Sequence, residues 1–392
     1  MTSDGLTRPL PADSPVGVTT RRAAAQRPAT RTTVRSQVLW VATAARGGIH
    51  GYTQALEATP LFSDWGMQRL VTHDDGPLAR RLGLFARGAA QLVWRCVRAR
   101  PALVHLHSAA YGSFARKALL LWAARGLFRV PTVLHLHAGE FETFYGECPP
   151  LARAVVRATL RRADRVITLS PALAAAVTRM APGTRVTVAA NGVALAPEAR
   201  TLAGDAPRVL FLGVLIERKD PVGLLRAWAS CRRPPGAQLV FGGDGPLRPE
   251  LERLVDELGL RSSVTFRGWL DPTGVAAELD KTDILALPSH FEGQPLALLE
   301  GMARGLALLS TRVGGIPDLI EDGVSGRLVP PGDPAALGRA LDELLNDGGT
   351  RQRYGAAAYA RAQHTFDIRR TWQSLDTLYQ TLTQRTPRGA HD

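Results

Sequence analysis

The feature that most constrains the fold is a regular alternation of short apolar runs with stretches of helical periodicity. Apolar runs of strand length that alternate with helical patterns indicate buried parallel strands joined by helical crossovers. The first series of runs is SQVLWVATA (36–44), ALVHLHS (102–108), PTVLHLHAGE (131–140), ADRVITLS (163–170) and RVTVAANGV (185–193). The second is VLFLGVL (209–215), QLVFGGDG (238–245), SVTFRGW (263–269), DILALPS (283–289), LALLSTRVGG (306–315) and GRLVPPGD (326–333).

The two series predict an α/β protein with two doubly wound, Rossmann-like domains that face each other across a cleft. The polar stretch 194–208 is the expected linker between a first domain at 37–200 and a second at 206–366. A last helical pattern at 367–385 is expected to pack back on the first domain. Because ligands of such sheets bind at the carboxyl ends of the strands, the cleft is the expected binding site.

Charge is the main signal of the composition, with 48 Lys and Arg against 35 Asp and Glu and a net charge of +13. This excess suits nucleic acid, anionic lipid or a phosphorylated ligand as partner, and a GC-rich genome that favours Arg explains it without any partner. Three widely spaced cysteines indicate neither a disulfide framework nor a zinc site. With no apolar run of the ~18 residues that span a bilayer and no secretory leader, the expected location is cytoplasmic, free or peripheral on the inner face of the cytoplasmic membrane.

Two segments are candidates for contact with anionic lipid. Residues 1–36 lack periodicity and read as a disordered basic tail, either solvated or loosely tethered. Residues 78–100 form an amphipathic helical pattern, with a stripe of Leu78, Leu82, Phe85, Ala89, Leu92 and Cys96 and with Arg80, Arg81, Arg87, Arg95 and Arg98 off that stripe. This pattern predicts either a core helix with a charged outer face or a basic face on a membrane.

The stretch HFEGQPLALLEGMARG (290–305) carries the strongest chemical signal, because two glutamates, Glu292 and Glu300, lie eight positions apart around an expected helix start. Pro295 suits the first helical turn, and the free N–H groups there favour an anion such as a diphosphate. A carboxylate about 4 Å from a phosphate is repelled by roughly 4 kcal/mol at an effective dielectric of 20. We therefore expect the glutamates to bind neutral hydroxyls on either side of a charged centre, as a nucleoside diphosphate sugar offers.

The cations that such a ligand needs are expected in FLGVLIERKDP (211–221), where Arg218 and Lys219 follow a strand. Arg can grip a phosphate through two donors and Lys acts as a point charge, and both stabilise a departing diphosphate. An exposed Arg-Lys pair in a turn is also common without any ligand.

At this point the chain resembles the retaining GT-B glycosyltransferases of family 4 (group 1 type), over roughly residues 37–385. The resemblance is carried by six segments, which together are far more specific than any one of them. In chain order they are RADRVITLS (162–170), AANGV (189–193), GGDGP (242–246), VTFRGW (264–269), the E-x7-E segment EGQPLALLEGMARG (292–305) and LLSTRVGGIPDLIEDGVSGRLVPPGD (308–333). It implies a GT-B fold with an acceptor-side first domain and a donor-binding second domain, and a nucleotide diphosphate sugar, most simply a UDP- or GDP-sugar, as donor.

The resemblance also implies roles for single residues. His137 and Glu292 would act at the transferred sugar, with His135 as the less secure choice on the same strand face. The expected donor-binding set is Arg218, Lys219, Gly293, Gln294, Pro295, Leu296, Glu300, Gly47, Gly48, Arg267 and Gly268. Arg116 and Lys117, with Arg80, Arg81 and Arg87, are candidates on the acceptor or membrane side.

Three positions depart from the family pattern: Val214 stands where many members have Arg, Ala307 replaces a usual Pro, and Asp318 a usual Glu. The chain has no D-x-D triplet, so no metal or cofactor is expected. The implied reaction transfers a sugar with retention to a hydroxyl of a glycan or lipid-linked acceptor, in bacterial exopolysaccharide, capsule or lipopolysaccharide assembly.

Other functions stay open at this point. A GT-B phosphorylase or a nucleotide-sugar epimerase is the first alternative, although a pyridoxal-dependent phosphorylase needs a cofactor lysine and the chain has few lysines. A nucleic-acid-binding protein ranks below it, because no basic stretch is interleaved with stacking aromatics; we expect no nucleic acid partner. A non-catalytic homologue is disfavoured by the presence of His137, Lys219, Glu292 and Glu300.

Overall fold

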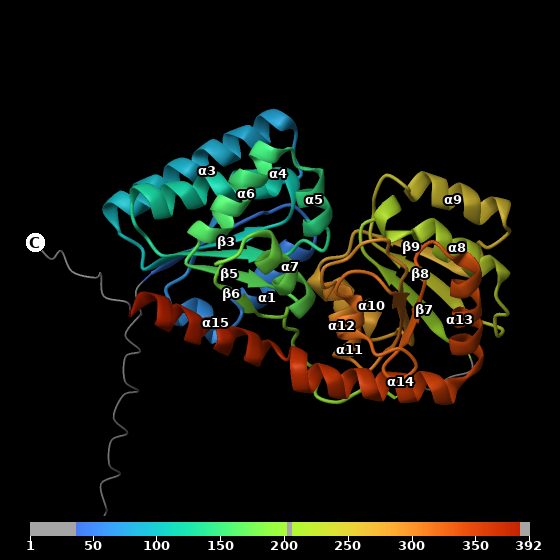
Figure 1. The fold of residues 1–392 in the computed structure, drawn as a ribbon. Helices are drawn as coiled ribbons and strands as arrows, with labels where there is room; N and C mark the ends of the chain where they lie inside the picture. The colour runs from blue at the N-terminus through green and yellow to red at the C-terminus, as the bar shows by residue number, and fades with distance from the viewer. Residues whose placement is uncertain (1–36, 202–205, 385–392) are drawn as a thin grey trace, which may run out of the picture. The chain divides into compact units, whose positions relative to one another are not determined.

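The computed structural model describes residues 37–201 and 206–384, which belong to one compact unit. The predicted basic tail (1–36) lies outside the described residues. Two parallel six-stranded sheets, each flanked by helices, organise the chain (Figure 1). The expectation of two doubly wound α/β domains is thereby confirmed, whereas their exact boundaries at 37–200 and 206–366 stay predictions.

The first sheet has the strand order β2-β1-β3-β4-β5-β6. Its strands are β1 (Val38–Ala42), β2 (Gln68–Val71), β3 (Leu103–Ser108), β4 (Thr132–Leu136), β5 (Arg165–Thr168) and β6 (Val186–Val188). The helices between them are α1 (Gly48–Glu57), α2 (Pro60–Asp64), α3 (Leu78–Arg98), α4 (Tyr111–Leu121), the π-helix η1 (Trp122–Leu127), α5 (Phe141–Glu147), α6 (Pro150–Arg162) and α7 (Pro171–Met180). Helices α3, α4 and α6 lie together on one side of this sheet (Figure 1).

The second sheet has the strand order β12-β11-β10-β7-β8-β9. Its strands are β7 (Arg208–Leu212), β8 (Gln238–Gly242), β9 (Val264–Gly268), β10 (Ile284–Leu287), β11 (Ala307–Thr311) and β12 (Arg327–Val329). The helices are η2 (Glu217–Lys219), α8 (Pro221–Ser230), α9 (Arg248–Glu257), α10 (Pro272–Leu279), α11 (Leu296–Met302), α12 (Ile316–Leu319), α13 (Pro334–Asn346), α14 (Gly348–Arg361), η3 (Ala362–Phe366) and α15 (Ile368–Thr383).

Asp-Pro pairs explain where several helices of the second half begin. Asp220, Asp271 and Asp333 each accept a backbone N–H of the first turn, and each is followed by a proline. The aspartate satisfies a donor that the helix leaves unpaired, and the proline costs nothing at the first helical position. Each Asp-Pro pair therefore fixes the residue at which its helix begins, and with it the end of the preceding loop.

Helix α15 ends the described chain and packs on the first half of the protein (Figure 1). Its Leu375 and Tyr379 are buried in one cluster with Trp40 of β1. Trp40 Nε1 donates to Tyr379 Oη at 3.0 Å, and Trp65 Nε1 donates to Asp376 at 2.8 Å. The last helix therefore completes the core on the side of the first sheet opposite α3.

The predicted helix at 78–100 forms as α3, but its predicted apolar stripe is partly wrong. Leu92 and Cys96 are buried, whereas Leu78 and Leu82 are 63% and 60% exposed. The helix has 21 residues, which span about 31 Å, while the six residues of β3 span about 20 Å. Its first turns overhang the sheet, so their leucines have no core to enter.

No helix among the described residues combines the length and apolar character needed to cross a bilayer.

Candidate active site

The E-x7-E segment lies where β10 ends and α11 begins, at the carboxyl edge of the second sheet. Glu292 is 8% exposed, and its Oε1 receives two hydrogen bonds. Lys219 Nζ donates to it at 2.7 Å and Ser289 Oγ at 3.1 Å. A nearly buried carboxylate needs such partners, because desolvation of an unpaired charge is costly. The structure thus joins Lys219, which is expected at the diphosphate, to Glu292, which is expected at the transferred sugar.

Close packing of glycine backbones fixes this loop. A Cβ on Gly314, whose φ is 51°, would meet the Glu292 carbonyl oxygen at 1.8 Å, and Gly315 N–H donates to that same oxygen. From the first half, a Cβ on Gly139 would meet the Glu292 carbonyl oxygen at 2.3 Å. A Cβ on Gly293 would lie 3.0 Å from the His137 carbonyl oxygen. Gly139 and Gly314 leave no room for a Cβ and Gly293 leaves little, so the loops after β4, β10 and β11 meet closely around Glu292 and Gly293.

The start of α11 differs from expectation, because the helix begins at Leu296 and Pro295 is its extended N-cap rather than a residue of its first turn. The Gln294 side chain, which is predicted to bind the donor, is instead hydrogen-bonded within the protein. Its side-chain oxygen accepts the backbone N–H of Asn191, and Asn191 Nδ2 donates to the Gln294 carbonyl at 3.0 Å. Asn191, in the AANGV segment, has no role that its local sequence predicts, because only the folded chain brings it to this loop.

Glu300 lies one turn into α11, and burial raises the pKa of its carboxyl to about 7 while the charge of Arg304 opposes that shift. Arg304 itself donates to Asp280 at 2.8 Å. Among the described residues, none donates a hydrogen bond to the Glu300 carboxylate; Arg304 donates to the Glu300 backbone carbonyl instead. A carboxylate that lacks partners and titrates near neutrality is typical of a ligand-binding position.

The other predicted donor-side residues fall into two groups. The Arg218 side chain is exposed on η2, beside the Lys219 that binds Glu292. The Arg267 side chain is paired with Glu278 at 2.9 Å, so it is not a free cation for the donor. The neighbouring Gly268, with a φ of 66°, ends β9 and can offer only backbone groups. Its carbonyl accepts the Gly243 N–H at 2.8 Å, so this turn is fixed by backbone bonds.

The glycine loop of the first half precedes α1, with Gly47 at its N-cap. A Cβ on Gly47 or on Gly48 would have no atom within 4 Å, so this loop borders open space. Three residues further, a Cβ on Gly51 would lie 3.0 Å from a methyl carbon of Leu296. Helix α1 therefore reaches the start of α11, and the structure brings the two predicted donor loops together.

Four histidines form a stacked array at the carboxyl ends of β3 and β4. In the parallel register His107 lies opposite His135. His105 shares hydrogen bonds with Tyr379 at 2.5 Å and with His135 at 3.3 Å, and His107 shares one with His137 at 3.0 Å. Burial lowers the pKa of both His105 and His137 to about 3, so these imidazoles are neutral near pH 7.

His137 is the member of this array that is partly exposed, whereas His135 is fully buried. This settles which of the two imidazoles is reachable from outside. A neutral imidazole with a hydrogen-bonded neighbour can hold a fixed tautomer toward a ligand. The catalytic role assigned to His137 stays a prediction.

Within the part of the chain that the structure describes, only His105, His107 and His135 stand close enough to hold an ion, with candidate nitrogen atoms within 4.8 Å of one another. The rings are stacked, with interplanar angles of 20° and 19° between His105 and the other two. The nitrogen lone pairs lie in the ring planes, so nearly parallel rings do not direct them to one point. The cluster suits a hydrogen-bonded stack better than a metal centre.

One acceptor-side candidate is corrected by the structure. Lys117 is 1% exposed, and its Nζ donates to Thr72 Oγ1 at 2.8 Å; burial lowers its pKa to about 7. It cannot form part of a membrane-side surface, because its α4 position faces β2 instead of solvent. Arg116 is partly buried, whereas Arg81 and Arg87 are exposed on α3, and Arg80 pairs with Asp74 at 2.5 Å.

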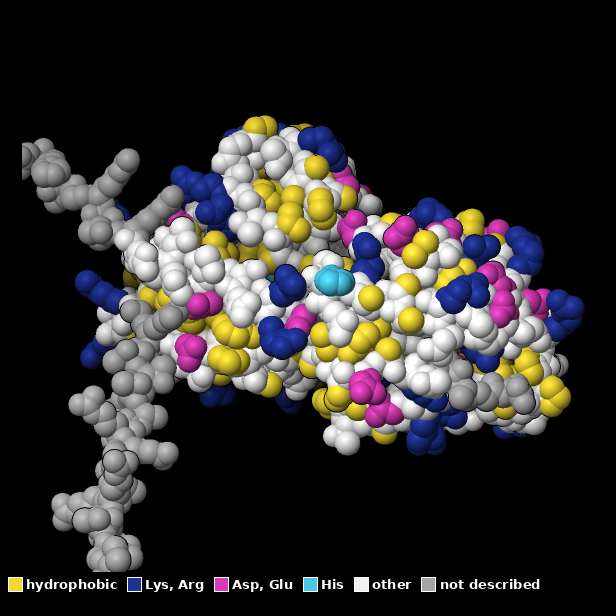
Figure 2. Space-filling model, turned by 90° about the horizontal axis from the view of Figure 1, so that it is seen from below, with side chains coloured by type: hydrophobic (Ala, Val, Ile, Leu, Met, Phe, Trp, Pro, Cys, Tyr) yellow, Lys and Arg dark blue, Asp and Glu magenta, His cyan; other side chains and the backbone are white. Residues whose placement is uncertain are grey.

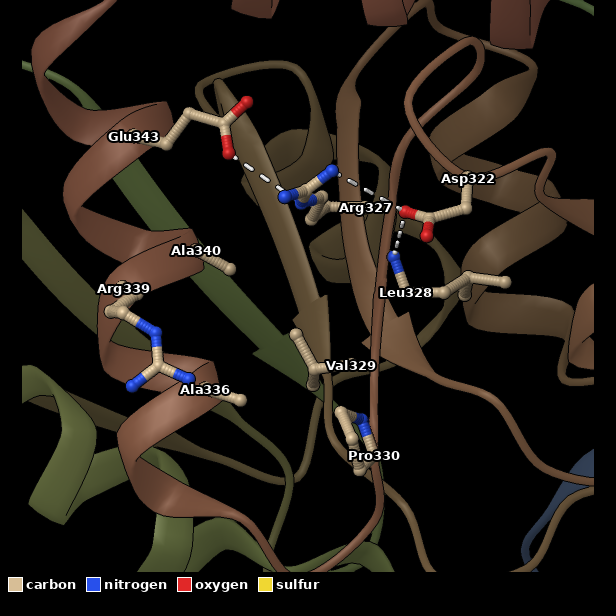
Figure 3. Close-up of a pocket in the computed structure, with 9 residues that line it drawn as sticks. All are labelled: Asp322, Arg327, Leu328, Val329, Pro330, Ala336, Arg339, Ala340 and Glu343. Carbon is tan, nitrogen blue, oxygen red and sulfur yellow. Dashed lines mark hydrogen bonds and ion pairs between the residues drawn. The ribbon is translucent and has the colours of Figure 1, made fainter.

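A separate pocket lies between β12 and α13 (Figure 3). Its charged groups largely satisfy one another, because Arg327 lies between Asp322, at 3.8 Å, and Glu343, at 3.5 Å. None of the predicted donor residues lines it. Because its arginine and carboxylates are already ion-paired, this pocket is not a second candidate active site.

Two family models match the chain: Glycosyltransferase Family 4 at residues 41–196 and Glycosyl transferases group 1 at residues 195–361. The chain belongs to the group 1 glycosyltransferases. Together the matches span nearly every strand of both sheets, which confirms the family expected from the sequence and shows that the protein is a glycosyltransferase.

Characterised relatives support this assignment. The chain is 28% identical to the alpha-D-kanosaminyltransferase of Streptomyces kanamyceticus over 77% of this chain and 84% of that protein. It is 30% identical to the glycogen synthase of Mycobacterium tuberculosis over 71% of this chain and 67% of that protein. Anabaena HepE, solved in complex with UDP and glucose, superposes with a TM-score of 0.69 at 19% identity and covers 88% of this chain and 100% of that one. The fold is therefore GT-B.

Proposed function

We propose that this glycosyltransferase moves a sugar, with retention at the anomeric carbon, from a nucleotide diphosphate sugar to a hydroxyl of a glycan or lipid-linked acceptor. The observation that carries the proposal is the meeting of Lys219, Glu292 and the backbone next to His137 at the carboxyl ends of both sheets. Anabaena HepE was solved with UDP and with glucose, which favours a UDP-sugar over a GDP-sugar as donor. Assembly of a bacterial surface polysaccharide is the proposed setting.

In the proposed reaction the bond between the anomeric carbon and the diphosphate breaks and a bond to the acceptor oxygen forms. The acceptor proton passes to the departing diphosphate. Arg218 and Lys219 would stabilise the charge that develops on this leaving group. Val214 cannot supply the Arg that many members have after the glycine that follows β7, so the exposed guanidinium of Arg218 would replace it.

Glu292 and Glu300 would take different parts of the donor. Glu292 would accept hydrogen bonds from hydroxyls of the transferred sugar while Lys219 neutralises it. Glu300 would accept hydrogen bonds from the ribose hydroxyls, and it does so best as a carboxylate. Because burial raises its pKa to about 7, this contact is expected to weaken as the pH falls through neutrality.

The test is a panel of UDP-, GDP- and ADP-sugars assayed by thermal stabilisation and by transfer, with the anomeric configuration of the product read by NMR. A donor at 100 times its dissociation constant adds about 2.7 kcal/mol to stability. We expect one base to stabilise the wild type, and its affinity to fall below pH 7. Glu300→Gln should bind at least about tenfold more weakly, as expected for loss of a charged hydrogen bond, and should show no such pH dependence.

The matched control is Glu257→Gln, which removes a carboxylate from exposed α9 and should leave donor affinity unchanged. An inverted product would overturn the retaining mechanism. Stabilisation by no nucleotide sugar at all would overturn the donor site. If the protein instead converts a glycan and inorganic phosphate into a sugar phosphate, the phosphorylase alternative would be supported.

A further inference from the structure

The outer face of the first sheet's helical layer is chemically one-sided. Helices α3, α4, η1 and α6 pack side by side (Figure 1). Within their described spans they contain no Asp or Glu, although the chain as a whole has 35. Their arginines are Arg80, Arg81, Arg87, Arg95, Arg98, Arg116, Arg125, Arg153, Arg157, Arg161 and Arg162. Lys117 of α4 is buried and is not part of this outer face.

The same layer displays most of the large apolar side chains that are exposed in the described residues. On α3 these include Leu82 and Trp94, on η1 Leu127 at 77% exposure, and on α6 Leu151 at 79%. Outside the four helices the exposed ones are Val188, Leu258, Trp269, Phe291 and Val324. Exposed apolar groups that gather within a basic surface mark a binding surface rather than a solvated one.

A pocket of about 450 Å³ opens where η1 meets the end of α6, and Arg125, Gly126, Arg129 and Arg162 line it. Arg125 pairs with Asp164 at 2.9 Å. Arg129 and Arg162 have no carboxylate partner among the described residues, and the Arg162 guanidinium stacks on the Trp122 ring at 4.6 Å. Since Gly126 has no side chain, the Arg162 guanidinium can lie against its backbone.

We propose that this helical layer docks on an anionic lipid bilayer and that the Arg125–Arg129–Arg162 pocket receives a lipid phosphate. A guanidinium offers several donors to phosphate oxygens, and the stacked ring holds one of them in place. Exposed Leu127, adjacent to the pocket, would then reach the acyl boundary while the phosphate binds below it. Most of the large apolar side chains exposed on this layer are leucines and valines, which suit an acyl boundary better than a nucleic-acid surface, where bases stack on aromatic rings.

A second face of the molecule gives no comparable surface. Figure 2 shows Lys and Arg side chains scattered there among Asp, Glu and apolar groups. The proposal concerns only the helical layer, and it is independent of which donor or acceptor the enzyme uses.

The experiment is flotation of the full-length protein with vesicles of phosphatidylcholine alone and of equal parts phosphatidylcholine and phosphatidylglycerol. The pocket variant is Arg129→Gln with Arg162→Gln, and the apolar variant is Leu127→Ser with Leu151→Ser. The control, Arg253→Gln with Arg261→Gln, removes the same charge from the second half, where both arginines are exposed. All variants keep residues 1–36, so any contribution of that segment cancels.

We expect binding only to vesicles with phosphatidylglycerol. One arginine near an anionic bilayer contributes about fivefold in partitioning, so the pocket variant should bind more than tenfold more weakly. The apolar variant should also lose binding, and the control should lose less than the pocket variant. Donor-induced thermal stabilisation should persist in all of them, which separates this proposal from the catalytic one.

Three results would overturn the proposal. Equal losses in the pocket variant and the control would mean a diffuse charge effect with no site. Displacement from vesicles by inorganic phosphate at low concentration, with no loss in the apolar variant, would indicate a soluble phosphate ligand. Tighter binding to duplex DNA than to the anionic vesicles would indicate a nucleic-acid partner.

Discussion

The two halves of the molecule share one architecture and treat charge in opposite ways. In the second half, helix α9 pairs Arg248 with Glu252 and Arg253 with Glu257, and Glu278 of α10 binds two arginines. In the first half, helices α3, α4 and α6 carry arginines without any acidic residue. Since exposed ion pairs contribute little to stability, the fold does not demand either pattern. The acid-free surface of the first half is the one that the proposed lipid contact would use.

The carboxyl edges of the two sheets differ in the same sense. The second sheet places a charged pair, Lys219 and Glu292, where the first sheet places neutral imidazoles. Charge at the former edge suits a diphosphate sugar, and its absence at the latter suits an acceptor hydroxyl. Substitutions in the Lys219–Glu292 pair and in the histidine array should therefore change stability by different amounts and with different pH dependence.

The largest effect is expected from separating the buried pair. Lys219→Ala leaves the Glu292 carboxylate nearly buried without its cation, and loss of a buried partner costs about 3–5 kcal/mol. Lys219→Met combined with Glu292→Gln should recover most of the stability, because neither residue then carries a charge. Both variants should lose transfer. Urea unfolding and initial rates measure the two effects, and a catalytically active double variant would contradict the site.

The next effect concerns the histidine array. His105 and His137 have pKa values of about 3 in the folded protein, below the ordinary 6.5 of the unfolded chain. The unfolded state therefore binds more protons below pH 6.5, and stability should fall on acidification by up to about 1.4 kcal/mol per pH unit for each histidine. The stability that the neutral histidines contribute should be fully present above pH 6.5.

The measurement is urea unfolding of the wild type and of His105→Asn across this pH range. The variant should be less stable near neutrality and should have the shallower slope. Glu300 shifts stability in the opposite direction, since its pKa is raised, so the difference between the two proteins is the informative quantity. Parallel slopes would show that the array is not the acid-sensitive element.

The smallest effects should come from the outer surfaces. Arg253→Gln removes an exposed pair on α9, and Arg87→Glu introduces an acid on exposed α3. Each should change the free energy of unfolding by less than about 0.5 kcal/mol. Only Arg87→Glu should weaken flotation with anionic vesicles. A large stability loss in either variant would mean that surface charge supports the fold after all.

Periodicity and loop chemistry predicted the fold class and the family because both are written locally, in strand-length apolar runs and in the E-x7-E segment. The burial of Lys117 could not be predicted, since its acceptor, Thr72, is 45 positions away in the chain. The same holds for Asn191 and Gln294, which meet only in the folded protein. The histidine array did leave a signal, because a His-Leu-His triplet occurs in both adjacent strands, but the parallel register was needed to see that the rings stack.

Helix α15 has a consequence for the order in which this protein is made. Tyr379 is hydrogen-bonded to Trp40, 339 positions earlier, and to His105 in the core of the first half. During translation the ribosome delivers the first sheet long before this tyrosine leaves the exit tunnel. The amino-terminal half must therefore wait on the nascent chain with an open core, and its native packing closes only after the whole second sheet has been synthesised.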